Sequence, residues 1–366
     1  VHNPKREIQR KPLIDNGSHF WARCRPIRLT LARRILQHAV MNRRTLVQTG
    51  FAAAGLGATG CTGAPSRKAH DEMPLESAPH QRTLMQWPVS LEVYGARDLA
   101  AVQANIADIA NAVSEHEPVA LMAAPGARGL DRTRLSGAVE IWDIPTDDLW
   151  CRDSGPTFVK NEAGDLAVSL IQFNGWGDKQ PHANDARIAR RVAERLGLPV
   201  IDSGVVGEQG GVEHDGAGTL LAHASCWVND NRNPGLSADQ IAERLCTALG
   251  AEKMISPDAP WSIAAHETLG ILERATDAQG RPLTITRLPE PYVIRARADD
   301  FVSSYVNYYV CNGAVIAAQF GDREADAEAH EILTSLYPGR QIVQLNIDAL
   351  GASGGGIHCA TQQQPA

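Results

Sequence analysis

The chain has 366 residues, of which 43% are apolar, 21% charged and 5% aromatic. This length and apolar content suffice for a large buried core, and the ordinary charged fraction argues against disorder or a coiled coil. No apolar run reaches the roughly 18 residues that a membrane-spanning helix needs. The composition therefore favours a globular protein of one large domain or two.

The start of the chain differs in composition from the rest. Residues 1–40 carry many Lys and Arg, almost no acidic residues and no sustained apolar period. A new signal begins at Met41, so we expect Met41 to be the true start and residues 1–40 to be an upstream, non-native extension. The alternative is a basic tail that precedes a buried apolar helix.

Residues 41–60 have the pattern of an export signal. Arg43 and Arg44 precede a short Gly- and Ala-rich apolar stretch that ends in small residues before Cys61. The arginine pair resembles a twin-arginine signal, and the end resembles a lipobox with Cys61 as the lipidation site. We therefore expect export to the periplasm or cell envelope, with membrane contact only through a lipid anchor at Cys61.

The net charge, −7 for the whole chain, becomes more negative when these first 60 residues are set aside. The remaining residues hold 24 Lys and Arg against 40 Asp and Glu, a net charge of −16. Such a domain repels nucleic acid and attracts cations, which fits a guanidinium or polyamine ligand. Seven cysteines are scattered without metal spacing, and no Gly-x-Gly-x-x-Gly motif lies at a predicted strand–helix junction, so we expect no metal, nucleotide or flavin cofactor.

A strand–loop–helix–strand unit recurs at least four times from about Thr83 onward. Helices are predicted at residues 99–113, 186–196, 237–249 and 325–336, and the strands that follow them at 119–122, 200–201, 253–255 and 341–345. This alternation predicts an α/β fold, and a recurring unit permits a closed, propeller-like arrangement around a common centre. Since no Pro- or Ser-rich linker interrupts it, residues 83–366 are predicted to be one catalytic domain after a linker at 61–82.

The C-terminal segment 354–363 is rich in the residue types that carry chemistry. Its three glycines allow a close backbone approach or a positive φ. If residues 357–359 form a strand, His358 and Cys359 point in opposite directions, and we expect Cys359 to face the site. A cysteine thiolate is a strong nucleophile when its pKa is lowered. A small buried residue after a glycine turn is the alternative, and this segment alone does not decide between them.

Several motifs resemble the agmatine deiminase and bacterial peptidylarginine deiminase family. They keep the family order from about Pro74 to the C-terminus: LWCRDSGPTFV, FNGWG, GAGTLL, NDNRNPGLS, SYVNYY, QFGD and GGGIHCATQQQPA. The last is the most specific. The resemblance implies a five-fold pseudo-symmetric α/β-propeller of ββαβ-type units, the pentein fold. It also implies hydrolysis of a guanidine with release of ammonia; for agmatine the product is N-carbamoylputrescine, a putrescine precursor.

The resemblance assigns roles to particular residues. Cys359 would attack the guanidinium carbon, Asp153 would hold the guanidinium N–H groups, and a histidine would serve as acid and base. Asn307 matches a position that the family keeps near its site. Trp150 and Trp176 are further substrate-binding candidates, although core packing is equally plausible for each. Glu208, Glu213 and Asp215, which lie near the family's second acidic segment, are the remaining candidates. On a strand, Glu213 and Asp215 would share one face.

One family segment is missing from this sequence. The catalytic histidine of the family lies in a Gly-His-x-Asp-Asn segment, but here Ile255 is followed directly by Ser256. One unit is therefore expected to be truncated near 255–256, without the general acid/base and one carboxylate, and to leave a sheet edge unpaired. His214, His266 and His358 are candidates to replace the missing histidine, and each is expected to be structural.

The sequence leaves three interpretations open. An exported guanidine deiminase with weakened turnover is favoured, and GGGIHCATQQQPA favours agmatine over peptidyl-arginine, whereas export points the other way. A non-catalytic binder of cationic ligands is the second. The third is an internal deletion or a sequence gap at the 255–256 junction in an otherwise ordinary enzyme gene.

Overall fold

The computed structural model describes residues 38–41, 71–256, 268–296 and 301–366. The expected signal and lipidation residues Arg43, Arg44 and Cys61 lie outside this part of the chain, and so does His266. Among the described residues, no helix is both long enough and apolar enough to cross a membrane.

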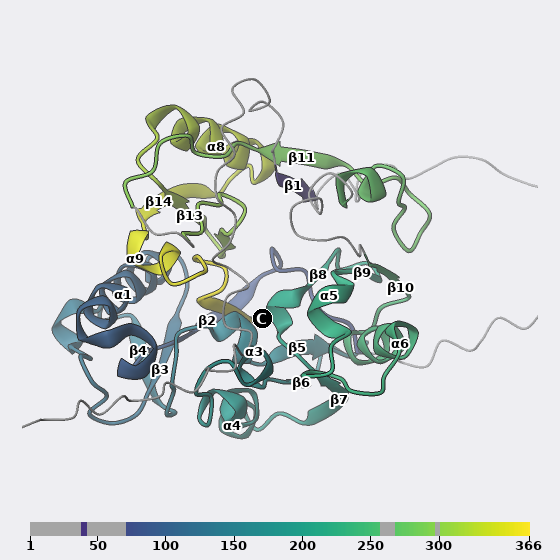
Figure 1. The fold of residues 1–366 in the computed structure, drawn as a ribbon, viewed down its shortest axis with the longest axis horizontal. Coiled ribbons are helices and arrows are strands. Elements are labelled where there is room, and N and C mark those ends of the chain that lie inside the picture. Colours follow the sequence, from purple (N-terminus) through teal and green to yellow (C-terminus); the bar gives the residue numbers. More distant parts are fainter. Residues whose placement is uncertain (1–37, 42–70, 257–267, 297–300) are drawn as a thin grey trace, which may run out of the picture.

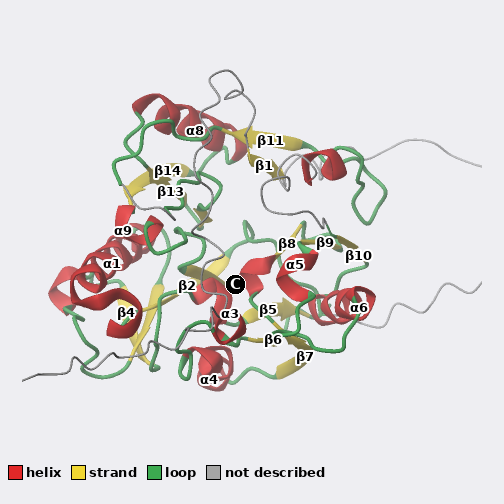
Figure 2. Cartoon of the chain, viewed as in Figure 1, coloured by secondary structure: helices red, strands yellow, loops and turns green. Residues whose placement is uncertain are grey.

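The described strands form five separate sheets (Figures 1 and 2). The strands are β1 (His38–Met41), β2 (His80–Gln86), β3 (Val119–Ala123), β4 (Val139–Asp143), β5 (Thr157–Lys160), β6 (Leu166–Gln172), β7 (Val200–Val206), β8 (Val212–His214), β9 (Thr219–Ala222), β10 (Lys253–Ile255), β11 (Ile285–Leu288), β12 (Tyr309–Val310), β13 (Ala314–Gln319), β14 (Gln341–Asn346) and β15 (Thr361–Pro365). Their order in the sheets is β15-β2-β3-β4, β5-β6-β7, β10-β9-β8, β12-β13-β14 and β1-β11.

The α-helices connect or flank these strands. They are α1 (Leu91–Ser114), α2 (Cys151–Ser154), α3 (Gly175–Asp178), α4 (Ile188–Leu196), α5 (Ala224–Trp227), α6 (Ala238–Leu249), α8 (Arg323–Leu336) and α9 (Asp348–Gly351). Each of the four long helices, α1, α4, α6 and α8, links two parallel neighbours in one sheet: β2 to β3, β6 to β7, β9 to β10, and β13 to β14. In each case the first of these strands also pairs antiparallel with another strand. The four predicted helices and the strands that follow them are therefore confirmed.

Helix α6 shows how the sequence sets these bounds. Ser237 accepts a hydrogen bond from the Gln240 N–H, and the Gln240 side chain accepts one from the Ser237 N–H, which forms a capping box. Gly250 ends the helix at a φ of 69°, a left-handed conformation that glycine adopts without strain. Ile241 and Leu245 repeat at helical spacing and are buried, so one face of α6 packs into the core.

The strand β11 departs from this repeated arrangement. Among the described residues, β11 pairs only with β1, antiparallel, with His38 opposite Leu288 and Met41 opposite Ile285. Residues 268–272 before it are helical. The other four sheets contain a parallel pair joined by a helix, whereas the sheet of β11 does not.

The segment before β2 packs as part of the domain. Met73 is 6% exposed and Glu76 is 6% exposed, and the Glu72 backbone exchanges two hydrogen bonds with Lys160 on β5. Of the linker expected at 61–82, residues 71–79 are therefore held against the folded domain, and residues 80–82 belong to β2.

The last strand, β15, lies in the middle of the molecule. It pairs antiparallel with β2, with Thr361 opposite Met85, and the C-terminus lies near the centre of the view in Figure 1. All five residues of β15 are buried. The turn that precedes β15 carries Cys359, so the sheet fixes the candidate nucleophile close to the centre.

Candidate active site

Cys359 lies in a turn and not in a strand. The Ala360 N–H donates to the Ile357 carbonyl at 3.2 Å, and the Thr361 N–H donates to the His358 carbonyl at 3.2 Å. β15 begins only at Thr361. The expected strand over residues 357–359 is therefore wrong. The prediction that His358 and Cys359 point in opposite directions assumed a strand, so it loses its basis. The tight i→i+3 hydrogen bonds of the turn replace the ladder of a strand.

The glycine run allows this turn to approach its neighbours. A Cβ at Gly355 would lie 2.2 Å from the Trp150 ring, and one at Gly356 would lie 2.6 Å from the Asn307 amide carbon. Gly354 has a φ of 96°, which side-chain-bearing residues rarely adopt. Trp150 is 6% exposed, so in this structure it packs behind the turn. The glycines thus let the turn that carries Cys359 pack closely against Trp150 and Asn307.

Asn307 holds the Cys359 sulfur and its backbone at the same time. Its Nδ2 donates to Cys359 Sγ at 3.1 Å, while its Oδ1 accepts from the His358 N–H at 2.9 Å and the Cys359 N–H at 3.4 Å. Because the two N–H donors need an oxygen acceptor, these bonds also fix which end of the amide faces the sulfur. An N–H donor at the sulfur favours the thiolate over the thiol.

The short helix α2 carries Asp153 to the same place. The Trp176 indole N–H donates to Asp153 Oδ2 at 3.0 Å. A Cβ at Gly210 would lie 2.2 Å from Asp153 Oδ1, so a glycine there leaves room for the carboxylate. Burial, and next the negative charge of Glu208, raise the pKa of Asp153 to about 7. The carboxylate is thus costly to ionise here and gains from a cation.

The loop that leads into α2 is fixed by a buried carboxylate. Asp185 is 2% exposed, and its two oxygens accept the N–H groups of Asp147 at 2.8 Å and Asp148 at 2.9 Å. Gln86 adds a further bond to Asp185 at 3.3 Å. Burial is the main reason that the pKa of Asp185 lies well above its usual range. This arrangement orients the backbone five residues before Asp153.

Glu208 is a second acidic group near Asp153, and it is paired. Arg232 NH1 lies 2.8 Å from Glu208 Oε2, and the same nitrogen donates to Asn174 at 2.8 Å. Burial raises the pKa of Glu208, and the Arg232 guanidinium opposes that shift. Arg232 was not singled out from the sequence, although it lies in the motif NDNRNPGLS.

Trp176 adopts an unusual backbone conformation beside this site. Its φ of 56° is in the left-handed region, which is rare for an aromatic residue. The Asn174 side chain accepts the Gly177 N–H at 2.9 Å, and the Trp176 ring packs edge-on against Phe173. Backbone strain of this kind persists only where surrounding contacts impose it, and it occurs often at functional sites. Trp176 is half-buried, so it has a partly open face beside Asp153.

Two acidic candidates occupy other positions. β8 ends at His214, so Glu213 and Asp215 do not share a strand face as expected. The Asp215 Oδ1 accepts the N–H groups of Ala217 at 2.8 Å and Thr219 at 2.9 Å, which makes it a turn-stabilising residue. Glu213 lies half-buried on β8, opposite Leu221 of β9. The structure thus brings together Cys359, Asp153, Asn307, Glu208 and the two tryptophans.

The pKa of the Cys359 thiol is raised when the site is empty. Burial raises its pKa first and the Asp153 charge second, whereas the Asn307 hydrogen bond and the Arg152 charge lower it. A bound cation that neutralises Asp153 would remove one of the two raising causes. The sulfur would then ionise more easily in the complex than in the free protein.

A buried cluster behind the turn was not recognised from the sequence. Glu76 Oε1 lies 2.8 Å from Arg152 NH2 and 2.7 Å from His358 Nε2. Arg152, which immediately precedes Asp153, pairs with Glu76. Glu76 is not part of a recognised motif, and its spacing from Arg152 and His358 follows no pattern. Only the fold therefore identifies the cluster.

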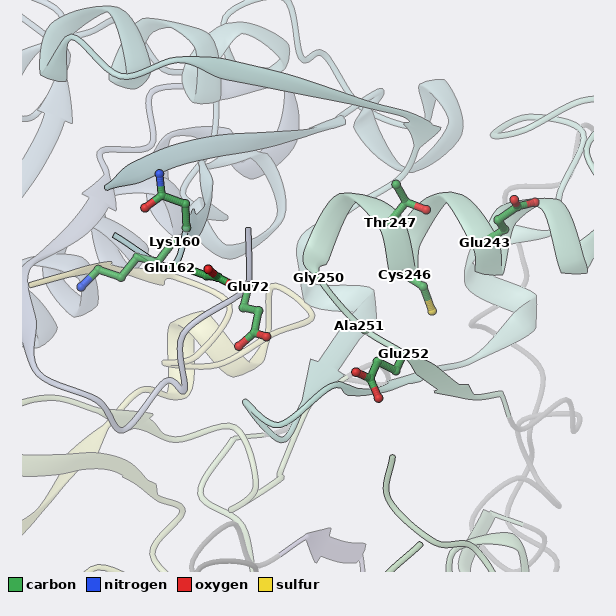
Figure 3. Close-up of a pocket in the computed structure, with 10 residues that line it drawn as sticks. Glu72, Lys160, Glu162, Glu243, Cys246, Thr247, Gly250, Ala251 and Glu252 are labelled. Atoms are coloured by element: carbon green, nitrogen blue, oxygen red, sulfur yellow. The ribbon is translucent and has the colours of Figure 1, made fainter. Parts of the chain in front are cut away.

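A separate cavity of about 480 Å³ lies elsewhere in the fold (Figure 3). It is lined by the β5 end, α6 and the residues that follow α6, and includes Lys160 and Cys246. None of its lining residues belongs to the group around Cys359. Volume alone does not make it the site, because it lacks the nucleophile and the buried carboxylate.

The family described as Porphyromonas-type peptidyl-arginine deiminase matches the chain in two pieces, residues 72–258 and 255–365. An agmatine deiminase of Pseudomonas aeruginosa is 31% identical over 353 residues, which cover 80% of this chain and 95% of that protein. Since 80% of 366 residues is about 293, about 60 positions of that alignment have no counterpart in this chain.

Solved structures of agmatine deiminases are also similar to this chain. The agmatine deiminase of Enterococcus faecalis superposes with a TM-score of 0.75 at 25% identity, over 84% of this chain and 99% of that chain. An agmatine deiminase of C. jejuni with substrate bound has a TM-score of 0.69 at 19% identity, over 81% and 96%, and supports the fold alone. The fold is the α/β pentein fold. The chain belongs to the Porphyromonas-type peptidyl-arginine deiminase family, which it shares with the agmatine deiminases that it resembles over most of their length.

Proposed function

We propose that this protein is a guanidine deiminase that converts agmatine and water to N-carbamoylputrescine and ammonia. The observation that carries the proposal is the position of Cys359. Its sulfur accepts a hydrogen bond from Asn307, and its pKa responds to the charge of the buried Asp153. A nucleophile beside a buried carboxylate suits a planar cation, and the relatives named agmatine deiminases support that substrate.

The charges of the site determine the sequence of events, in which substrate binding precedes ionisation of the thiol. The agmatine guanidinium donates N–H bonds to Asp153, which neutralises its charge and lowers the pKa of Cys359. The thiolate sulfur then forms a bond to the guanidinium carbon. A carbon–nitrogen bond breaks, the nitrogen leaves as ammonia after it gains a proton, and an amidino group remains on sulfur. Water then attacks that carbon, and the carbon–sulfur bond breaks to release the urea product and the thiol.

Both proton transfers need a group that the described site does not supply in the expected place. His358 Nε2 lies 2.7 Å from Glu76 Oε1, and His214 is buried on β8. The family match divides at residues 255–258, where the histidine segment was expected. We therefore propose that turnover is slower than in complete family members, by the roughly 10²–10⁴-fold that a general acid/base contributes.

The finer architecture is also part of this proposal. The five described sheets and the four helix-linked parallel pairs support a five-fold propeller whose unit at β11 is truncated. In this arrangement the missing residues would have supplied strands next to β11. The same deletion would then account for the short sheet and for the lost acid/base.

The test measures ammonia and N-carbamoylputrescine from agmatine, with peptidyl-arginine as a second substrate. We expect slow turnover of agmatine, none by Cys359→Ala, and retained agmatine binding by that variant. Faster turnover of peptidyl-arginine would assign the chain to protein citrullination instead. Turnover at ordinary enzyme rates would show that an acid/base is present after all.

A non-catalytic binder of cationic ligands is the second candidate. The split family match and the engagement of His358 by Glu76 favour it. Calorimetry with agmatine separates the two functions: tight binding with no detectable product over a day supports the binder, and product formation supports the deiminase.

We also propose that the protein is exported and lipid-anchored. Arg43, Arg44 and the small residues before Cys61 support a twin-arginine signal with a lipobox-like end. Cleavage before Cys61 would remove β1 and leave β11 without this partner. The intact mass of the native protein tests this: a mature chain that begins at a lipidated Cys61 is expected, and one that keeps residues 1–40 contradicts it.

A further inference from the structure

Glu76 connects two segments that are distant in the sequence. Its Oε1 accepts Arg152 NH2 at 2.8 Å and His358 Nε2 at 2.7 Å. Glu76 is 6% exposed, Arg152 is 2% exposed, and the His358 side chain is 18% exposed. One buried carboxylate oxygen therefore lies between two cationic side chains, if His358 is protonated.

Each of these two partners immediately precedes a residue of the proposed site. Arg152 is followed by Asp153 on α2, and His358 is followed by Cys359 in the turn. The two segments also bond directly: the Arg152 N–H donates to the Cys359 carbonyl at 3.0 Å, and Arg152 NH1 donates to Gln363 at 2.9 Å. Glu76 thus lies behind the junction of the carboxylate and the nucleophile.

We propose that Glu76 is a positioning residue that fixes Cys359 relative to Asp153 by binding Arg152 and His358 together. This inference rests on the proposed function of the site. The Oε1 of Glu76 is engaged by Arg152 and His358, so the role we assign to Glu76 acts through these two side chains. Removal of its charge leaves the buried Arg152 uncompensated and releases the hydrogen bond to His358, so both segments lose a common support.

Electrostatics and positioning have opposite effects on the thiol. If Glu76→Gln changed only the charge, loss of a nearby anion would lower the pKa of Cys359 and speed its alkylation. If the turn loosens, the Asn307 hydrogen bond and the Arg152 charge, which both lower that pKa, weaken and alkylation slows. The direction of the change therefore reports which effect dominates.

The experiment measures the iodoacetamide alkylation rate of Cys359 in the full chain between pH 6 and 10, with each cysteine quantified by peptide mass spectrometry. Glu76→Gln is compared with Glu140→Gln, whose side chain is 54% exposed and pairs with Arg82 and Arg195 on the surface. We expect Glu76→Gln to slow alkylation at pH 8 at least threefold and Glu140→Gln to leave it unchanged. A faster or unchanged rate in Glu76→Gln overturns the proposal.

A second variant keeps the test decisive if Glu76→Gln does not fold. His358→Gln removes one of the two bonds at a partly exposed side chain, and we expect it to slow alkylation in the same direction. An unchanged rate in folded His358→Gln also overturns the proposal. Calorimetry with agmatine runs in parallel: if the wild-type protein does not bind agmatine, the proposed function fails, while the alkylation comparison still decides the role of Glu76.

Discussion

At the scale of single residues, Asp153 combines burial with the need to carry a charge. The two conditions conflict in the free protein, where burial and Glu208 raise its pKa to about 7. Since the folded-state pKa lies above the ordinary carboxyl value, the unliganded fold loses stability as pH rises from about 4 to 7. A guanidinium cation reverses this cost by pairing with the ionised form.

Agmatine binding is accordingly expected to strengthen with pH. Only about a tenth of Asp153 is ionised one pH unit below its pKa, so apparent affinity should rise about tenfold between pH 6 and pH 8. Isothermal titration calorimetry at both pH values measures this. Asp153→Asn should bind more weakly and lose most of the pH dependence, and an equal dependence in that variant would assign the titration to another group.

Asn307→Ala is expected to raise the pKa of Cys359. The substitution removes the amide N–H that donates to Sγ and the oxygen that accepts two backbone N–H groups of the turn. The ultraviolet absorbance of the thiolate, followed against pH and corrected with Cys359→Ser, reports the shift. Asn105→Ala is the matched control, since this half-buried asparagine also donates through Nδ2, to the Asn346 carbonyl, and accepts a backbone N–H, that of Leu350, through Oδ1. A thiol pKa equal to that of the wild type would exclude the proposed role of Asn307.

At the scale of elements, the turn at residues 354–360 depends on close packing. Gly355→Ala would place a Cβ 2.2 Å from the Trp150 ring, so we expect it to cost about 1–3 kcal/mol and to weaken agmatine binding. Gly137→Ala has no heavy atom within 4 Å of the added Cβ and should be nearly neutral. Urea unfolding compares the two variants, and a neutral Gly355→Ala would mean that the Trp150 ring can move aside.

Local signals explain which elements could be predicted from the sequence. The helix α6 has an apolar period, a capping box and a C-terminal glycine, and all of these operate within a few residues of one another. The turn at Cys359 has a local glycine run, but its conformation also depends on contacts with Asn307 and Trp150, which lie in distant parts of the chain. Asp215 was predicted to be a site residue because the sequence alone does not show its hydrogen bonds. Its bonds to the Ala217 and Thr219 N–H groups, seen only in the structure, reveal its structural role.

The residues of the candidate site also fall into two groups, those that the sequence identified and those that it did not. Cys359 and Asp153 were found through motifs, whereas Glu76 and Arg232 were not, since their importance lies in long-range pairing. Ionic partners such as Glu76 and Arg152 are 76 positions apart and leave no periodic pattern. Sequence therefore identifies groups that the motif itself contains, and the fold is needed to identify the groups that hold them in place.

At the scale of the whole molecule, the proposed loss of the histidine segment would affect both the fold and the rate of turnover. We expect that inserting the corresponding segment of the Pseudomonas aeruginosa relative after Ile255 would raise agmatine turnover by about 10²–10⁴-fold. Ammonia release by the insertion variant and by the original chain gives the comparison. An insert of equal length with its histidine changed to Ala is the control. Equal rates in all three proteins would show that the segment does not limit turnover.

The pairing of β15 with β2 has a consequence for the order of folding. Thr361 lies opposite Met85, so this contact joins parts of the chain separated by most of the domain. Non-local strand pairing forms slowly, because loop closure precedes the contacts that reward it. On dilution from denaturant, helical circular dichroism should therefore recover before agmatine binding does. The reactive cysteine would remain accessible to modification during that interval, and a refolding protein would be most vulnerable to oxidation just before it becomes functional.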